Sequence, residues 1–401
     1  MNRLLIPLLA LLLVAGCQPT KKNSEPVVKY LDSPARASSG EPYLFTAANG
    51  SVYLSWIEKK ESQSEFKFSE LTGDRWTEPI SISSGNDWFV NWADYPMLVT
   101  NGQEFIAHHL AKSGESPYAY DIKLTTSKDG GKTWIEAGVL HDDGKQAEHG
   151  FVTLLPYNEN FFVVWLDGRN TVMEGMENMA GHHGSHHGAM SLRAAILDSQ
   201  GKKINEWELD NKTCDCCQTS AAITDNGPVV VYRDRSDEEI RDISILRLID
   251  GKWTSPKAIN DDNWKIAGCP VNGPRVEADG NVLVIAWYSV PEGNAQVNVI
   301  FSTDGGKTFG KPIRVDESDA IGRVDIVMLD KENVMVSWME GAVIKAAKIS
   351  QNGTKGTPVV IASSSKSRSS GFPQMTKSGD QIIFAWTDDE SKLVKTAFLT
   401  L

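Results

Sequence analysis

The chain has 401 residues, of which 41% are hydrophobic and 23% are charged, so long intrinsic disorder is excluded. Its 52 acidic residues outnumber its 40 basic residues and give a net charge of −12. This acidic balance argues against general nucleic-acid binding, which needs a basic footprint. A content of 12 Trp and 33 Gly favours an all-β chain with many turns, and all-β chains of this length often form one domain.

Residues 1–16 are typical of an export signal. Arg3 gives a positive start, and residues 4–14 form an apolar run that is too short for a confident membrane span. The segment VAGC that ends at Cys17 resembles a bacterial lipobox, so we expect cleavage before Cys17 and acylation of its thiol; a plain signal with an incidental cysteine is the alternative. Residues 17–26 then form a tether. The sequence therefore predicts an exported bacterial protein, on the periplasmic side or the cell surface, that contacts the membrane only through its N-terminal lipid.

An apolar segment that ends in an aromatic residue or His recurs through residues 27–401. Its seven copies lie 48 to 67 residues apart, at residues 52–56, 104–108, 161–165, 228–232, 283–287, 334–338 and 382–386. Most copies follow a Gly-containing turn that permits a tight hairpin. Four-stranded units that repeat in this way indicate a β-propeller. The sequence predicts an all-β single propeller with seven blades, or six as the alternative, in which Val27 to Leu31 closes the last blade.

Two turns between third and fourth strands share the pattern S-x-D-x-G-x-T-W/F. The shared positions are Ser127, Asp129, Gly131 and Trp134 in one turn and Ser302, Asp304, Gly306 and Phe309 in the other. The Asp accepts backbone N–H groups, the Gly takes positive φ and the aromatic ring packs between strands, so the pattern is structural and not catalytic. With these motifs, residues 27–401 resemble the sialidase-like Asp-box (BNR-repeat) propellers. That resemblance implies a propeller and, in enzymatic members, a glycan-processing site on the face opposite the Asp-boxes.

The chemically unusual residues map to that opposite face, because it collects the loops between second and third strands and the connections between blades. The longest such loop, from Asp167 to Arg193, has no Lys or Arg between Thr171 and Leu192. Its thioether and imidazole groups suit soft or borderline metals, above all copper, and imidazole also suits zinc and nickel. The expected ligands are Met173, Met176, Met179, His182, His183, His186, His187 and Met190. A flexible loop without a ligand is the alternative.

Four cysteines fall in two neighbouring connections on the same face: Cys214, Cys216 and Cys217 precede the fourth blade, and Cys269 precedes the fifth. Adjacent Cα atoms lie about 3.8 Å apart, below the usual disulfide range, so pairing to Cys269 is favoured over a bridge between Cys216 and Cys217. Structural disulfides and a thiolate site for metal or redox chemistry both stay open. His109 and His149 map to the same face and are additional candidate ligands.

Carboxylates recur two residues after the aromatic position, at Glu58, Asp167, Asp234, Glu340 and Asp388. We expect most of them to be solvated or ion-paired, whereas one in a drier pocket would have the raised pKa that a general acid requires. The family resemblance implies, in sialidases, three arginines that bind a sugar carboxylate, an Asp acid/base and a Tyr nucleophile. The candidate catalytic residues are Asp167, Asp234, Arg235, Arg275 and Arg323, none of which lies in a recognisable catalytic motif.

The leading hypothesis is a lipid-anchored propeller that binds a transition metal, with copper favoured, through the Met/His loop and the Cys cluster. Its partner would be a metal ion or a metallochaperone. The alternative is an exo-sialidase-like glycoside hydrolase or a glycan-binding lectin on the same scaffold. A purely structural interaction platform is the third hypothesis, because a fold does not fix a function.

Overall fold

The computed structural model describes residues 27–172 and 188–401. Within these residues the chain is built from β-strands, with two short 3₁₀ helices, η1 (Pro291–Gly293) and η2 (Arg368–Ser370). The predicted export signal, the lipidated Cys17 and the tether lie outside the described residues and stay predictions. In the described part of the chain, no helix has the length and hydropathy that a membrane span requires.

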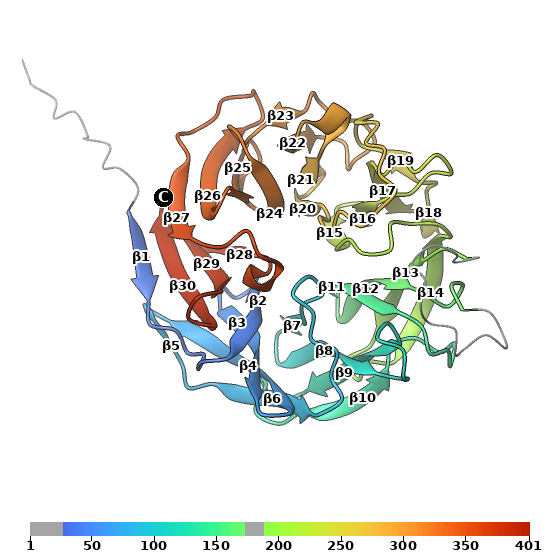
Figure 1. The fold of residues 1–401 in the computed structure, drawn as a ribbon, viewed down its shortest axis with the longest axis vertical. Helices are drawn as coiled ribbons and strands as arrows, with labels where there is room; N and C mark the ends of the chain where they lie inside the picture. The colour runs from blue at the N-terminus through green and yellow to red at the C-terminus, as the bar shows by residue number, and fades with distance from the viewer. Residues whose placement is uncertain (1–26, 173–187) are drawn as a thin grey trace, which may run out of the picture.

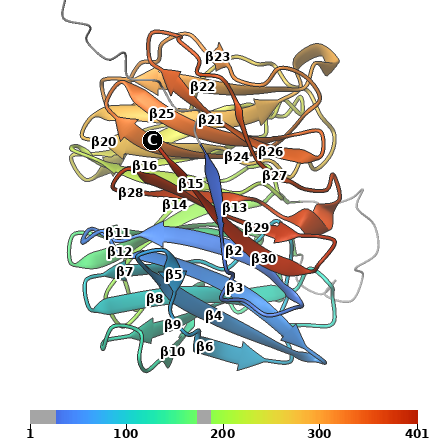
Figure 2. The same cartoon turned by 90° about the vertical axis from the view of Figure 1, so that its left-hand side faces the viewer.

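Seven antiparallel sheets stand in a ring around a central axis, as the blades of a propeller (Figure 1). Seen from the side in Figure 2, strands β8 to β10 and strands β21 to β23 lie at opposite ends of the ring. Blade 1 contains β2 (Ser39–Thr46), β3 (Val52–Lys60), β4 (Gln63–Thr72), β5 (Arg75–Trp76) and β6 (Ile80–Gly85). Blade 2 contains β7 (Leu98–Asn101), β8 (Glu104–Lys112), β9 (Tyr120–Ser127) and β10 (Ile135–Val139). Blade 3 contains β11 (His149–Tyr157), β12 (Asn160–Asp167), β13 (Ser191–Leu197) and β14 (Lys203–Asp210). Blade 4 contains β15 (Ser220–Thr224), β16 (Gly227–Arg233), β17 (Ile243–Ile249), β18 (Lys252–Trp253) and β19 (Lys257–Ala258). Blade 5 contains β20 (Arg275–Asp279), β21 (Val282–Ser289), β22 (Gln296–Ser302) and β23 (Ile313–Arg314). Blade 6 contains β24 (Ala320–Asp330), β25 (Asn333–Glu340), β26 (Val343–Ser350) and β27 (Val359–Ser363).

Blade 7 joins the two ends of the described chain. It contains β28 (Gln374–Ser378), β29 (Gln381–Asp388) and β30 (Leu393–Thr400), and its outer strand is β1 (Val28–Leu31), which pairs antiparallel with β30 (Figure 1, blue beside red). Tyr30 of β1 packs edge-on against Trp386, with ring centroids 6.0 Å apart. The predicted single propeller of seven blades, closed by an N-terminal strand, is therefore confirmed.

The Asp-box turns tie neighbouring blades together. Asp129 accepts the backbone N–H groups of Lys132 and Thr133 at 3.1 and 2.9 Å. Gly131 has a φ of +81°, and a Cβ there would lie 2.6 Å from the Phe68 ring of blade 1. Trp134 also packs against that ring, at 5.9 Å between centroids. Since the equivalent Asp304 and Gly306 make the same type of turn in blade 5, both Asp-boxes act as structural clamps between blades.

A buried Trp and an acid two residues later form a repeated pair at the ends of second strands. The indole N–H groups of Trp56, Trp165 and Trp338 donate to the carboxylates of Glu58, Asp167 and Glu340, at 2.9, 2.8 and 2.9 Å. Burial alone would raise the pKa values of these three acids, but hydrogen bonds from a nearby Lys or Arg and from the indole lower them. These recurring carboxylates are therefore held as ionised structural groups.

Candidate functional site

The connections between blades and the loops between second and third strands share one face, which we call the connection face. Its inner part includes residues 86–97, 140–148, 211–219 and 259–274, each of which leads into a new blade. Three groups of chemically active side chains lie on it: an acid-lined hollow, a His–Asp cluster and a Cys cluster.

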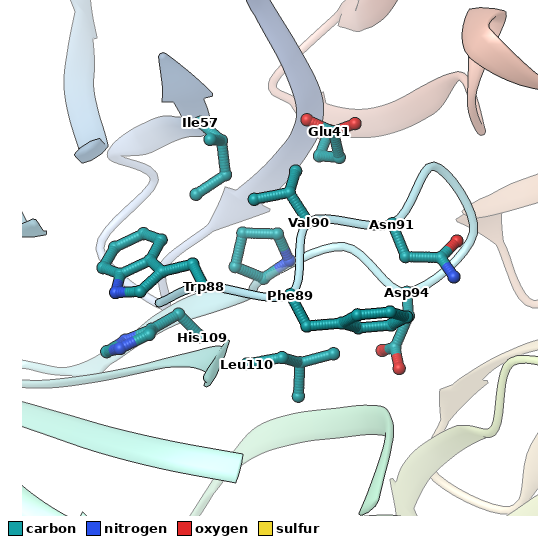
Figure 3. A pocket seen from close by; sticks show the side chains of 10 residues that line it. Glu41, Ile57, Trp88, Phe89, Val90, Asn91, Asp94, His109 and Leu110 are labelled. Carbon is teal, nitrogen blue, oxygen red and sulfur yellow. The ribbon is translucent and has the colours of Figure 1, made fainter. Parts of the chain in front are cut away.

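The acid-lined hollow, of about 10 Å³, lies where blade 1 meets blade 2 (Figure 3). The connection 86–97 supplies most of its wall, and β2, β3 and β8 supply the rest. Its polar and aromatic lining residues are Glu41, Trp88, Phe89, Asn91, Asp94 and His109. The His109 ring stacks on Trp88, with centroids 4.0 Å apart. Two carboxyl groups therefore share a small hollow with an aromatic wall.

Asp94 is the least satisfied acid of this hollow. It is 5% exposed, and its Oδ1 accepts the Phe151 N–H at 2.8 Å. Its Oδ2 has no hydrogen-bond partner among the described residues. Burial raises the pKa of Asp94 to about 8, because the Phe151 hydrogen bond offsets it only in part and the negative charge of Glu148 adds to it. A second hollow, also of about 10 Å³, is lined by Asp94 as well, so this residue with a protonated carboxyl near neutral pH lines both hollows.

Other acids near the propeller axis have raised pKa values as well. Burial raises the pKa of Glu41, and it raises the pKa of Glu148 to about 7 although Tyr120 donates a hydrogen bond to Glu148 at 2.7 Å. On the inner strands β20 and β24, burial raises the pKa of Glu277 to about 8 and that of Asp325 to about 6. The sequence analysis missed all of these acids. An acid inside a predicted inner strand, such as Glu277 in RVEAD, was the signal that could have found them.

The five sequence-predicted catalytic candidates do not converge on the hollow. Arg275 lies nearest the axis, where its guanidinium donates to the Tyr95 hydroxyl and lies 3.5 Å from Asp325. Arg323 is buried and donates to Ser370 and to the carbonyl groups of residues 367 and 371. Asp167 is fully buried and paired with Arg169, Asp234 accepts from Ser244, and Arg235 pairs with Glu239 and Asp215. These contacts give Asp167 and Arg323 structural roles.

The His–Asp cluster lies between blades 2 and 3. The His141 and His149 rings stack at 3.5 Å between centroids, with planes 4° apart. Asp143 bridges them, with Oδ1 2.9 Å from His141 Nδ1 and Oδ2 3.0 Å from His149 Nε2. His141 Nε2 has no hydrogen-bond partner among the described residues and lies 3.4 Å from Asp121 Oδ1. Two sets of ligand atoms, each within 4.8 Å, could hold a metal here: Asp121 with both histidines, and Asp143 with His149 and Asp167.

The described metal-ligand candidates do not form one pocket. His149 belongs to the His–Asp cluster, whereas His109 lies against Trp88 in the acid-lined hollow and belongs to neither set of metal-ligand atoms in the described chain. Met190 is buried, and its carbonyl accepts the Thr213 N–H at 3.0 Å. Met173 to His187, with the remaining predicted ligands, lie outside the described residues. The single ion pocket expected from the sequence therefore stays a prediction, and among its described ligands His109 and His149 belong to different groups of side chains.

The Cys cluster contains one disulfide and two free thiols, so the structural alternative holds for two of its four cysteines. Cys216 forms a disulfide with Cys269, as expected from the exclusion of a vicinal bridge, with Cα atoms 6.0 Å apart. Cys214 and Cys217 are free thiols, and their Sγ atoms lie 3.5 Å apart. The sulfurs of Cys214, Cys216 and Cys217 all lie within 4.8 Å of one another.

Two buried arginines give the Cys cluster a positive surrounding. Arg241 donates to Cys214 Sγ at 3.2 Å. Arg233 is 2% exposed and donates to the carbonyl oxygens of residues 241, 272 and 288. The hydrogen bond from Cys217 and the charges of the two arginines, acting against burial, together lower the pKa of Cys214 to about 6. Burial raises the pKa of Cys217, so Cys214 is the thiolate of the pair and Cys217 the donor.

No protein-family model and no curated protein matches the chain. Among solved structures it is similar to the α-L-arabinofuranosidase Arb93A from Fusarium graminearum, at 11% identity over 94% of this chain and 97% of that one, with a TM-score of 0.50. An α-L-arabinanase from Penicillium chrysogenum matches at 10% identity, with the same two coverages and a TM-score of 0.50. The NanB sialidase from Streptococcus pneumoniae matches at 13% identity over 93% of this chain and 70% of that one, with a TM-score of 0.47. Likeness at these identities shows the fold alone, which is a β-propeller.

Proposed function

We propose that this propeller binds and hydrolyses a glycan at the acid-lined hollow, with Asp94 as the general acid. The observation that carries the proposal is the Asp94 carboxyl, which is buried and has one unpartnered oxygen, in a residue that lines both hollows. A pKa of about 8 keeps this carboxyl protonated at neutral pH, as an acid that protonates a leaving group requires. The fold neighbours named as an arabinofuranosidase and an arabinanase support a glycan substrate.

Glycoside hydrolysis uses two carboxyl groups, and Glu41 is the second one in this hollow. Asp94 would protonate the glycosidic oxygen, and Glu41, whose pKa is raised by burial, would act as base or nucleophile in its deprotonated form. Trp88 offers an aromatic surface for a sugar ring, and the Asn91 amide offers hydrogen bonds. At about 10 Å³ the hollow admits roughly one water molecule, so binding of a sugar unit requires the connection 86–97 to move outward.

The first test is a panel of aryl glycosides, including arabinofuranosides and sialosides, assayed with the purified full chain. We expect turnover of at least one substrate, and we expect Glu41→Gln to lower kcat by about 100-fold or more, because the second carboxylate is lost. Glu115→Gln is the matched control, since Glu115 is exposed and lies outside the lining of both hollows. Absence of turnover across the panel, together with absence of glycan-array binding, would remove this proposal. Binding without turnover would leave a lectin.

A second candidate function is capture of a transition metal at the His–Asp cluster. It is favoured by His141 Nε2, a buried nitrogen without a hydrogen-bond partner in the described chain, 3.4 Å from Asp121. Two ligand atoms that each lie about 2.0–2.2 Å from a tetrahedral ion are roughly 3.3 Å from one another. The ligand atoms of each set lie within 4.8 Å of one another, so they need to move only a short way together to bind an ion. Because the two rings are parallel, one of them must rotate out of the stack to share an ion with the other. Copper, favoured from the sequence, and zinc both accept imidazole ligands.

Metal loading followed by dialysis and elemental analysis tests this second candidate. We expect the full chain to retain about one equivalent of copper or zinc and the double variant His141→Ala/His149→Ala to lose it, because imidazole nitrogens are the principal ligands. His109→Ala is the control, since His109 lies outside both sets of ligand atoms. Equal metal content in the wild type and the double variant would contradict a site at the His–Asp cluster.

A further inference from the structure

The Cys cluster places a buried thiol pair beneath an exposed disulfide. Cys214 and Cys217 are 1% and 2% exposed. Cys269 is exposed, and Cys216 is half-buried. We propose that the four cysteines form an internal thiol–disulfide relay, which moves one disulfide between the exposed pair Cys216–Cys269 and the buried pair Cys214–Cys217. The relay is independent of the glycan site, and its substrate is a thiol or disulfide of a second molecule that reaches Cys269.

Cys214 is the nucleophile of the relay because two donors contact its sulfur and a second buried cation lies near it. Cys217 lies at 3.5 Å and Arg241 Nη1 at 3.2 Å, and Arg233 adds a second buried positive charge. Since the hydrogen bonds of Arg233 go to backbone carbonyl groups, a thiolate at Cys214 supplies the anion that a buried guanidinium needs nearby. The thiolate, and not the thiol, attacks disulfides.

The exchange proceeds in two balanced steps. First, the Cys214 thiolate attacks Cys216 Sγ; the Cys214–Cys216 bond forms, the Cys216–Cys269 bond breaks, and the electron pair leaves on Cys269. Second, Cys217 loses its proton to water and attacks Cys214 Sγ; the Cys214–Cys217 bond forms and the electron pair leaves on Cys216. The chain contains one disulfide and two thiols before and after, so no external oxidant is needed. The exposed pair is then a dithiol that can reduce a disulfide on a second molecule.

The surrounding backbone holds the two connections in place, so that side-chain rotation suffices for the exchange. The Cys214 N–H donates to the Arg233 carbonyl at 3.1 Å. Gln218 links its own connection to two others, since its amide donates to the Ala93 carbonyl of residues 86–97 at 2.6 Å and accepts the Gly273 N–H of residues 259–274 at 2.9 Å. A Cβ at Gly273 would lie 2.1 Å from the Gln218 carbonyl oxygen, so this close approach requires glycine.

Alkylation without any reductant tests the relay. All proteins carry Cys17→Ser, which leaves four of the five cysteines, and are incubated with iodoacetamide at pH 7 before peptide mass mapping. We expect Cys269 to become labelled, because the exchange transiently releases it, and we expect Cys214→Ser to slow this labelling by about tenfold or more, because the nucleophile is gone. Cys217→Ser should stop after the first step and accumulate the Cys214–Cys216 bond.

Arg241→Gln separates chemistry from folding. It should slow Cys269 labelling at pH 7 and recover the wild-type rate at pH 9, where the thiolate forms without the arginine; a purely structural role would not produce this pH-dependent recovery. Melting curves identify any variant that fails to fold. Three outcomes would overturn the relay: Cys269 stays unlabelled in the full chain, Cys269 is labelled equally fast in Cys214→Ser, or the thiols react only after a chelator strips a bound metal.

Discussion

Replacing Asp167 by alanine should lower the free energy of unfolding by about 3–5 kcal/mol, the usual cost of removing one partner from a buried ion pair. Asp167 is fully buried. It accepts the Trp165 indole N–H at 2.8 Å and two guanidinium N–H groups of Arg169, both at 2.8 Å, and it lies 3.6 Å from His149. The alanine variant leaves the indole without an acceptor and Arg169 without its closest counter-charge.

Denaturant unfolding of matched variants checks this expectation. Asp388→Ala is the control from the equivalent position of blade 7, where the Trp386 indole has no hydrogen-bond partner in the described chain and Lys395 pairs with the acid near the surface. We expect it to cost about 1 kcal/mol or less. Asp167→Asn should fall between the two alanine variants, because it keeps an acceptor for Trp165 but loses the charge. Equal losses in free energy of unfolding for Asp167→Ala and Asp388→Ala would contradict the expectation that the buried Asp167–Arg169 pair stabilises the fold more than the pair near the surface.

The fold could be predicted from the sequence because its signals are local and periodic. Each blade repeats an apolar second strand that ends near a Trp, Tyr or His, and a Gly-containing turn usually precedes it. The closing strand was predictable because the last unit has only three strands of its own and Val27 to Leu31 is an unassigned apolar segment. The strand order within a meander also assigns each loop to one of two faces, so the Asp-boxes and the cysteines could be placed on opposite sides.

The candidate site could be predicted only in part, because its chemistry depends on distant neighbours. The pKa of Asp94 is raised by burial against residues that include Phe151, which lies 57 positions away. Nothing within residues 86–97 reveals that burial. Likewise, the sequence predicted pairing to Cys269 but not which cysteines stay reduced, because Arg233 and Arg241 reach Cys214 only after blade 4 has folded. The connection face was predictable, and the separation of its His, Cys and acid groups around the ring was not.

Asp94→Asn should lower the kcat of any glycoside that the protein hydrolyses by about 100-fold or more, because the general acid is lost while the side-chain shape is kept. The same variant should change the pH dependence of stability. The pKa of Asp94 is about 8 in the folded chain against 3.8 ordinarily. With the folded pKa raised, its contribution to stability is fully present below pH 4 and is lost as the pH rises to 8. The wild type should therefore lose stability across this window, and the variant should not.

The effect of Asp94→Asn on kcat tests whether Asp94 is the general acid, and its effect on stability tests whether the Asp94 carboxyl is buried and protonated. At pH 8 the variant should exceed the wild type in free energy of unfolding by about 2–5 kcal/mol, whereas at pH 4 the two should differ little. Asp87→Asn, an exposed change in the same connection, should alter neither stability nor kcat. A gain in stability at pH 8 without a loss of turnover would mean that Asp94 is buried and protonated but is not the acid of the reaction. A loss of turnover without the pH-dependent gain would mean that Asp94 acts in the reaction but that its carboxyl is hydrated in the free protein, since a hydrated carboxylate avoids the cost of burial.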